Sequence, residues 1–297
     1  MRTISILLTV MFVSVNAFCQ SADSTVRKNV NHKVYRVNYF VSGAIIAVGM
    51  TGDFFAIPRL KSKPALTLDE LAFVNSEEQK NLINPMDRWS LKQPATNRTM
   101  WKKVSDDGEI VIFLLPSLLM IDKNIRKDWL HLLFMYVEGH TFTFTFYNYS
   151  PLGPWFQNRL RPAVYYPELG IDAQTNSNNR NSFFSGHVGS CAYSTFFMTK
   201  VYCDYHPEIG GMKYLLYLAA SVPPLIIGYA RIRSLDHFPS DVAVGFGLGA
   251  AIGIIVPALH KLPVSKYLTV GLSTSSETTG FSVGFKIPDK RIVASSR

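Results

Sequence analysis

Six apolar segments, separated by polar and charged stretches, dominate the sequence between residues 37 and 259. Several of them are shorter than the roughly 20 residues that a helix needs to cross a bilayer. They are therefore either tilted spans or buried helices of a bundle that lies only partly in the membrane. The segments cover residues 37–58, 109–121, 130–149, 191–202, 213–230 and 241–259.

This pattern predicts an all-α fold, a membrane-associated bundle of about six core helices. Hydrophobic residues make up 47% of the chain and charged residues only 17%, which is too apolar for an ordinary soluble domain. We expect extra helices in the polar region 65–106. The last apolar segment carries glycines that fail the spacing of a dinucleotide-binding loop, so we expect them to let a neighbouring helix approach closely. These glycines are Gly245, Gly247, Gly249 and Gly253.

The two ends of the chain differ from its centre. Residues 1–20 combine one arginine, an apolar stretch and a small-residue region, which is typical of a secretory signal peptide cleaved near Ala17 to Gln20. An N-terminal segment, 21–65, follows; it contains one apolar helix that we expect to be broken at Gly52 and Asp53. The tail, 263–297, alternates apolar and polar residues around a polar turn and predicts a β-hairpin.

The formal net charge of +9 bears on the partners of the protein. In a membrane protein, basic residues first indicate orientation and contacts with anionic lipid. There is no basic amphipathic run or RNA-binding signature, so we expect membrane lipids and no nucleic acid as partners. Cys191 and Cys203 are separated by about 18 Å of helix rise, too far for a disulfide, and we expect both to be packing residues. The oligomeric state stays open.

Three polar groups stand at the edges of apolar segments. If the helices pack side by side, these edges meet at one end of the bundle. Arginine forks and the free N–H groups at the start of a helix bind phosphate oxygens, and two histidines can supply a nucleophile and a proton donor. No cluster has the spacing of a metal site, so we expect no metal and no cofactor. The groups are Arg159, Arg161 and Pro162; Ser185, Gly186 and His187; and Arg231, Arg233, His237 and Asp241.

Together these groups resemble the type 2 phosphatidic acid phosphatase and vanadium haloperoxidase superfamily. Its pattern reads Lys-x6-Arg-Pro, then Pro-Ser-Gly-His, then Ser-Arg-x5-His-x3-Asp. The sequence has "PWFQNRLRP", "FSGH" and "ARIRSLDHFPSD" in the same order, and the resemblance covers residues 80 to 260. It departs at Pro154, Phe184 and Ala230, which replace the lysine, a proline and a serine. Pro154 matters most, because it removes a cation from the phosphate site.

The resemblance implies a role for each matching position. It makes His237 the nucleophile, Asp241 the partner that orients it, and His187 the general acid that later activates water. For the missing cation we favour Arg159, with Arg180 and Arg233 as alternatives. The implied phosphate-binding groups are Arg161, Ser185, the Gly186 amide and Arg231. The helical domain that carries them is expected to span residues 66–262.

The implied activity is metal-independent hydrolysis of a phosphate monoester or diphosphate, on a lipid, through a phosphohistidine. A vanadate-dependent haloperoxidase and an inactive membrane scaffold of the same fold are the alternatives, and the apolar composition favours the lipid phosphatase. In this superfamily the site usually faces outward, so we expect a bacterial cell-envelope protein with a periplasm-facing site. A cleaved signal conflicts with that orientation if all six segments span the membrane.

Overall fold

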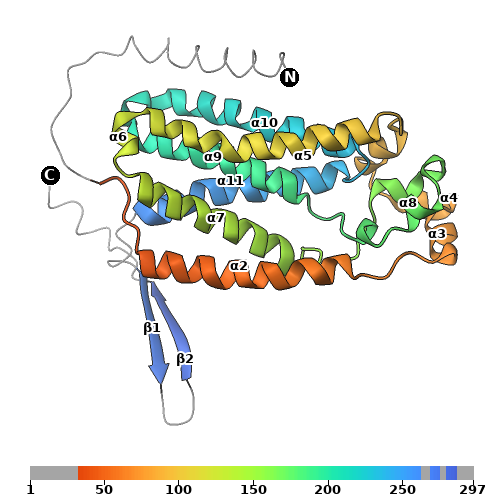
Figure 1. The fold of residues 1–297 in the computed structure, drawn as a ribbon, viewed down its shortest axis with the longest axis horizontal. Helices are drawn as coiled ribbons and strands as arrows, with labels where there is room; N and C mark the ends of the chain where they lie inside the picture. The colour runs from red at the N-terminus through yellow and green to blue at the C-terminus, as the bar shows by residue number, and fades with distance from the viewer. Residues whose placement is uncertain (1–32, 262–267, 275–278, 286–297) are drawn as a thin grey trace. The chain divides into compact units, whose positions relative to one another are not determined.

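The long helices of the protein lie lengthwise beside one another, as the pattern of apolar segments predicts (Figure 1). The structure is a computed structural model that describes residues 33–261, 268–274 and 279–285. The expected signal peptide lies outside the described residues. The long helices are α2 (Tyr39–Lys61), α5 (Arg98–Leu114), α7 (Trp129–Tyr149), α9 (Gly186–Tyr205), α10 (Lys213–Arg233) and α11 (Pro239–Lys261).

Shorter helices fill the connections. The expected extra helices of the polar region are α3 (Leu68–Val74), α4 (Glu77–Leu82) and the 3₁₀ helix η1 (Asp87–Lys92). Thr67 and Glu70 form a capping box that starts α3, since each side chain accepts a hydrogen bond from the other residue's backbone N–H. The remaining connections contain α6 (Lys123–Arg126), α8 (Ile171–Thr175), η2 (Leu115–Ile121), η3 (Pro162–Tyr165), η4 (Pro167–Leu169), η5 (Ser177–Arg180) and η6 (Pro207–Met212).

Helix α9 lies at the centre of the bundle and packs against α5, α7, α10 and α11. Its buried residues point in all directions, as expected of a helix surrounded by protein. Tyr193, Phe197 and Val201 face one apolar cluster, and Val188 and Cys191 face another. The packing role predicted for Cys191 is therefore confirmed.

Helices α9 and α11 approach each other so closely that their backbones touch. A Cβ atom added at Gly245 would collide with the Ser185 carbonyl oxygen, and one at Gly249 with the Gly189 carbonyl oxygen. Gly253 is likewise closed off by α9, whereas a Cβ at Gly247 would meet nothing within 4 Å. The close approach predicted from these glycines is confirmed at three of the four positions.

The prediction of a broken helix at Gly52 and Asp53 is wrong, because α2 runs unbroken through both residues. The Asp53 carboxylate accepts hydrogen bonds from Asn148 Nδ2 at 2.8 Å and Thr145 Oγ1 at 3.3 Å, so α7 satisfies its charge. The Gly52 carbonyl accepts the Tyr149 hydroxyl of the same helix. A polar interruption in the sequence is thus a contact between two helices in the structure.

Three helices of the described residues are long and apolar enough to cross a membrane: α2, α10 extended by η6, and α11. Helices α5, α7 and α9 do not meet that measure, which agrees with a bundle in which some helices are buried rather than exposed to lipid. Exposed apolar side chains such as Phe40, Phe54 and Val48 line α2. They fit a lipid-facing surface.

The tail contains two strands, β1 (Leu268–Thr274) and β2 (Thr279–Phe285), that pair antiparallel with Val270 opposite Val283. They fall on the alternating stretches of the sequence.

Candidate active site

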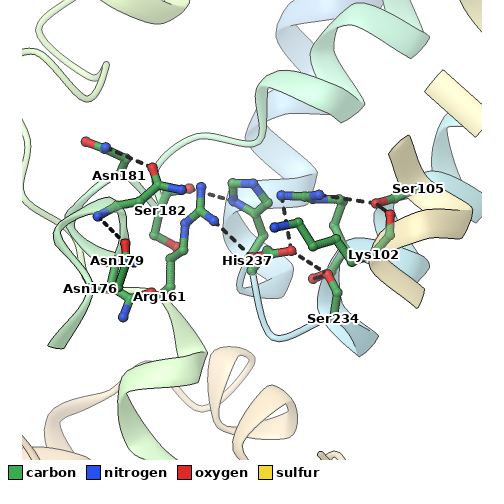
Figure 2. Close-up of polar contacts among 12 residues, drawn as sticks. Lys102, Ser105, Arg161, Asn176, Asn179, Asn181, Ser182, Ser234 and His237 are labelled. Carbon is green, nitrogen blue, oxygen red and sulfur yellow. Dashed lines mark hydrogen bonds and ion pairs between the residues drawn. The ribbon is translucent and has the colours of Figure 1, made fainter. Parts of the chain in front are cut away.

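The three motif groups meet at one end of the bundle, where α10 ends and where α9 and α11 begin. Figure 2 shows Arg161 of the first group and His237 of the third at this end. Backbone hydrogen bonds hold the first group against the second: Arg161 N donates to Asn179 O at 2.8 Å, and Ser182 N donates to Arg159 O at 3.0 Å. The stretch "IDAQTNSNNR", which reads as a loop, is therefore shaped by α8, η5 and these bonds. It fixes where Arg161 enters the site.

Asp236, which the motifs do not assign, lies between the two predicted phosphate-binding arginines. Its Oδ1 accepts a hydrogen bond from Arg161 Nη1 at 2.9 Å, and its Oδ2 lies 3.2 Å from Arg231 Nη2. The Ser234 hydroxyl donates to Oδ2 at 2.8 Å. Burial acts to raise the pKa of Asp236, but the charges of Arg231 and Arg161 outweigh it and hold the pKa well below its usual value. Asp236 therefore fixes both guanidinium groups while staying ionised.

Several buried donors of the predicted phosphate-binding residues lack a partner. Arg161 Nε, Arg231 Nε and Ser185 Oγ are buried and make no hydrogen bond with the described residues. Ser185 is the N-cap residue of α9, yet its hydroxyl does not cap the helix. An unsatisfied buried donor costs free energy, so three of them in one site indicate an anion that would accept from them.

His237 is fully enclosed at this end of the bundle. Its Nδ1 lies 2.7 Å from the Ser182 carbonyl oxygen and 3.6 Å from Asp241 Oδ2. Asp241 Oδ2 accepts instead from the Ser182 hydroxyl at 2.7 Å and from Phe238 N at 2.8 Å. Burial lowers the pKa of His237, the Asp241 carboxylate opposes this, and Arg231 and Arg161 add to it. The ring is thus held neutral, with a backbone carbonyl as the nearest partner of Nδ1.

His187 stands in the first turn of α9 and faces α5. Its Nε2 lies 3.2 Å from Asp106 Oδ1 and 3.2 Å from Glu109 Oε2. Burial lowers the pKa of His187 well below its usual value, and the charges of Arg231 and His237 act in the same direction. Asp106 also accepts from Arg231 Nη1 at 3.1 Å. His187, a predicted catalytic residue, and Arg231, a predicted phosphate-binding residue, therefore both contact the Asp106 carboxylate.

Sequence reasoning missed the contribution of α5 to the site. The site-facing residues of α5 follow helical spacing, i, i+3, i+4 and i+7, within a segment that reads only as polar. That spacing is a signal, but it has meaning only once α5 is known to pack beside α9 and α10. These residues are Lys102, Ser105, Asp106 and Glu109.

The Arg159 guanidinium contacts two carboxylates and a hydroxyl. Its Nη2 donates to Asp87 Oδ2 at 2.6 Å, and its Nη1 donates to Asp241 Oδ1 at 2.5 Å and to Ser240 Oγ at 2.9 Å. Its guanidinium carbon also lies 4.9 Å from the centre of the Phe238 ring. Arg159 therefore braces Asp241 from the side away from His237, and a direct role in phosphate binding stays a prediction.

The two alternative cations, Arg180 and Arg233, also form hydrogen bonds with other residues. Arg180 donates to both carboxylate oxygens of Glu70, and Arg233 Nη1 donates to Gln93 Oε1 at 2.9 Å. The carbonyl of Pro154, the residue at the expected lysine position, accepts from Lys63 Nζ at 2.6 Å. Lys63 also donates to Gln157 O and Arg180 O, so it holds the loop together.

Near His187, a hollow of about 310 Å³ is lined by Glu109, Ile110, Phe113, Leu114, Phe144 and Ser190.

Residues 128–263 match the family model of the PAP2 superfamily. The matched segment, residues 128–263, belongs to this superfamily. It is also 29% identical, over 156 residues, to phosphatidylglycerophosphatase B of Bacillus subtilis (strain 168), a match that covers 50% of this chain and 68% of that protein. Helix α5 lies outside the residues that the family model matches.

A crystal structure of a transmembrane PAP2-type phosphatidylglycerolphosphate phosphatase from Bacillus subtilis is similar at 15% identity. The TM-score is 0.42, and the match covers 72% of this chain and 94% of that one. Within the described residues, no group of three or more His, Cys, Asp or Glu side chains could hold a metal ion.

Proposed function

We propose that the protein is a phosphatase that hydrolyses a phosphate monoester or diphosphate on a lipid through a phosphohistidine at His237. The observation that carries the proposal is the set of unpartnered buried donors on Arg161, Arg231 and Ser185 near an enclosed, neutral histidine. These groups offer a tetrahedral phosphate its hydrogen bonds in a site where few water molecules compete.

In the first step, the Nε2 lone pair of His237 attacks phosphorus, and the bond from phosphorus to the leaving oxygen breaks. The negative charge of the bound phosphate raises the pKa of His187, and the protonated ring gives its proton to that oxygen. The Ser182 carbonyl, 2.7 Å from Nδ1, stabilises the positive charge that develops on the His237 ring. In the second step, His187 takes a proton from water, the water oxygen attacks phosphorus, and the P–N bond breaks to return the lone pair to Nε2.

Two features support a lipid as the substrate. The hollow lined by Ile110, Phe113, Leu114 and Phe144 begins at Glu109, a neighbour of His187, and is mostly apolar. Three helices with the length and composition of membrane spans accompany the site. A chain bound in the hollow would leave its phosphate beside His187. The name of the Bacillus relative adds phosphatidylglycerophosphate to the substrates worth testing, with phosphatidate and polyprenyl diphosphates.

We further propose that the site faces the periplasm of a bacterial cell envelope. The Arg36 backbone N–H donates to the His260 carbonyl at 2.9 Å, so the start of α2 lies beside the end of α11, far from the site at the start of α11. Residue 36 would then be cytoplasmic, and residues 1–20 would not act as a cleaved export signal. Labelling intact cells with an impermeant maleimide tests this: Lys103→Cys, beside the site, should react, and Lys213→Cys, at the far end, should not. The reverse pattern would place the site in the cytoplasm.

The activity itself is tested with the purified protein in detergent and the three lipid phosphates named above. Phosphate release is expected from at least one of them, and His237→Ala should abolish it. Denaturing gels after incubation with ³²P-labelled substrate should show a labelled band that is acid-labile, as phosphohistidine is, and that His237→Ala lacks. Halide oxidation by peroxide in the presence of vanadate, without phosphate release, would support the haloperoxidase instead. Absence of both activities would support the inactive scaffold.

A further inference from the structure

Helix α5 forms a wall of the site although it lies outside the residues matched by the family. Ser105 Oγ accepts from Arg231 Nη1 at 3.2 Å, and Asp106 accepts from the same nitrogen at 3.1 Å. Glu109 lies one turn further along and contacts His187. Lys102 occupies the same face one turn earlier. The four residues therefore run along the site from the bundle end towards the apolar hollow.

The charges fixed around the two histidines do not yet suit a phosphate. Arg161, Arg231 and Arg98, which lies 3.9 Å from Asp236 Oδ1, bring three positive charges, and Asp236, Asp106 and Glu109 are three carboxylates. Burial raises the pKa of Glu109, which favours its neutral form. With Glu109 neutral, two carboxylates offset two of the three arginines. The remaining positive charge is less than the two charges of a phosphate dianion, so a further cation would strengthen the electrostatic attraction to the site.

Lys102 is the cation placed to correct this balance. Its side chain is exposed and extends from α5 towards His237 (Figure 2). The Lys102 backbone carbonyl accepts from Ser105 Oγ at 2.7 Å, which ties this residue to the one that contacts Arg231. No hydrogen bond or ion pair engages its ammonium group within the described part of the chain. The neighbouring Lys103, by contrast, pairs with Asp107 at 3.9 Å.

We propose that Lys102 contacts the phosphate of the substrate and supplies positive charge to it. This charge is needed because carboxylates offset the charges of Arg161 and Arg231. The proposal rests on the proposed function of the site. An ammonium at the rim would reach oxygens on the side of the phosphate that faces α5, where the two arginines are already engaged with Asp236 and Asp106. As the phosphoryl group transfers, its charge spreads over three equatorial oxygens, and a third cation stabilises that state.

The test compares Lys102→Met with the matched control Lys103→Met, on p-nitrophenyl phosphate and on phosphatidate, together with inhibition by vanadate. Lys102→Met should lower kcat/KM on both substrates by about 10- to 100-fold and weaken vanadate inhibition, since a charge-assisted hydrogen bond is lost. Lys102→Arg should restore most of the activity. Lys103→Met should behave as the unmodified protein does.

Three outcomes would overturn the role of Lys102: unchanged kinetics in Lys102→Met, an equal loss in Lys103→Met, or a loss confined to phosphatidate, which would make Lys102 a contact for lipid surfaces. Each of these leaves the proposed function intact as long as His237→Ala is inactive. If the unmodified protein hydrolyses none of the three lipid phosphates named above, the proposed function fails instead, and vanadate binding to the two lysine variants still reports whether Lys102 holds an oxyanion.

Discussion

The carbonyl oxygen of Ser182 lies 2.7 Å from Nδ1 of His237. A carbonyl oxygen only accepts hydrogen bonds, so Nδ1 must carry the proton and Nε2 must hold the lone pair. The chain thereby sets the tautomer that an attack on phosphorus requires. The carboxylate of Asp241 acts through a second contact, since it accepts the hydroxyl of the same serine at 2.7 Å.

Asp241→Asn is therefore expected to reduce phosphate release without abolishing it. The carbonyl of Ser182 still orients the ring, but the negative charge that stabilises a cationic phosphohistidine is lost. We expect turnover to fall by about 10- to 100-fold, the effect of losing one charge-assisted contact, whereas His237→Ala is inactive. Ser182→Ala keeps the carbonyl and should cost only a few-fold. Single-turnover phosphate release measures all three, and equal inactivity of Asp241→Asn and His237→Ala would show that the carbonyl is not enough.

Asp106→Asn is expected to shift the pH profile of the reaction towards acid. The Asp106 carboxylate lies 3.2 Å from His187 Nε2 and favours the protonated ring, so its loss lowers the pKa of His187. His187 must be protonated to release the leaving group, and the alkaline limb of kcat should move down by roughly 0.5 to 1 pH unit. KM should fall or stay constant, because a negative charge near the phosphate is removed. The control is Asp107→Asn, an exposed carboxylate on the same helix; an equal shift there would refute a local effect on His187.

Phosphate release is expected to survive chelation and to be inhibited by vanadate. The proposed phosphate-binding groups are arginines, a lysine, a hydroxyl and an amide, which need no cation to hold an anion. Vanadate takes up the trigonal bipyramidal geometry of the transferring phosphoryl group and should compete with substrate. Turnover before and after dialysis against EDTA checks this. Loss of turnover that magnesium or zinc restores would contradict the mechanism.

Gly249→Ala is expected to destabilise the protein, and Gly247→Ala to leave it unharmed. An alanine Cβ at position 249 would strike the backbone of Gly189, so α9 and α11 must move apart at an expected cost of about 1–3 kcal/mol. Position 247 is open, and there alanine improves helix propensity. Thermal unfolding in detergent, monitored by circular dichroism, separates the two variants. Equal midpoints would show that the two helices tolerate separation.

Much of the fold can be predicted from the sequence, because segments that are buried or face lipid are apolar and close helix contacts need small residues. The apolar segments become the long helices, and the small residues of 245–253 mark where α11 touches α9. Asp53 shows the limit of this reasoning. A carboxylate inside an apolar segment reads as an interruption, because its partners Asn148 and Thr145 lie on another helix that the local pattern does not reveal.

The same limit applies to the site. The motifs predict roles for His187, His237 and Asp241 because the spacing within each motif is local. They do not identify Asp236 or the site-facing residues of α5, because these roles depend on how α5, α9 and α10 pack together. The contacts of Arg159 cannot be predicted for a related reason. Its distance along the chain from Arg161 suggests one shared site, yet Asp87, more than 70 residues away, takes its guanidinium.

The touching backbones of α9 and α11 have a consequence for how new specificities could be selected in this scaffold. Helix α9 carries His187, α11 follows directly on His237, and neither can shift relative to the other without breaking the contact at Gly249. The wall opposite them, α5, has one described glycine, Gly108, and a Cβ added there would meet only the end of the Ile227 side chain and no backbone atom. Substitutions in α5 could therefore be screened for activity on new head groups and chain lengths, while the distance between His187 and His237 stays the same.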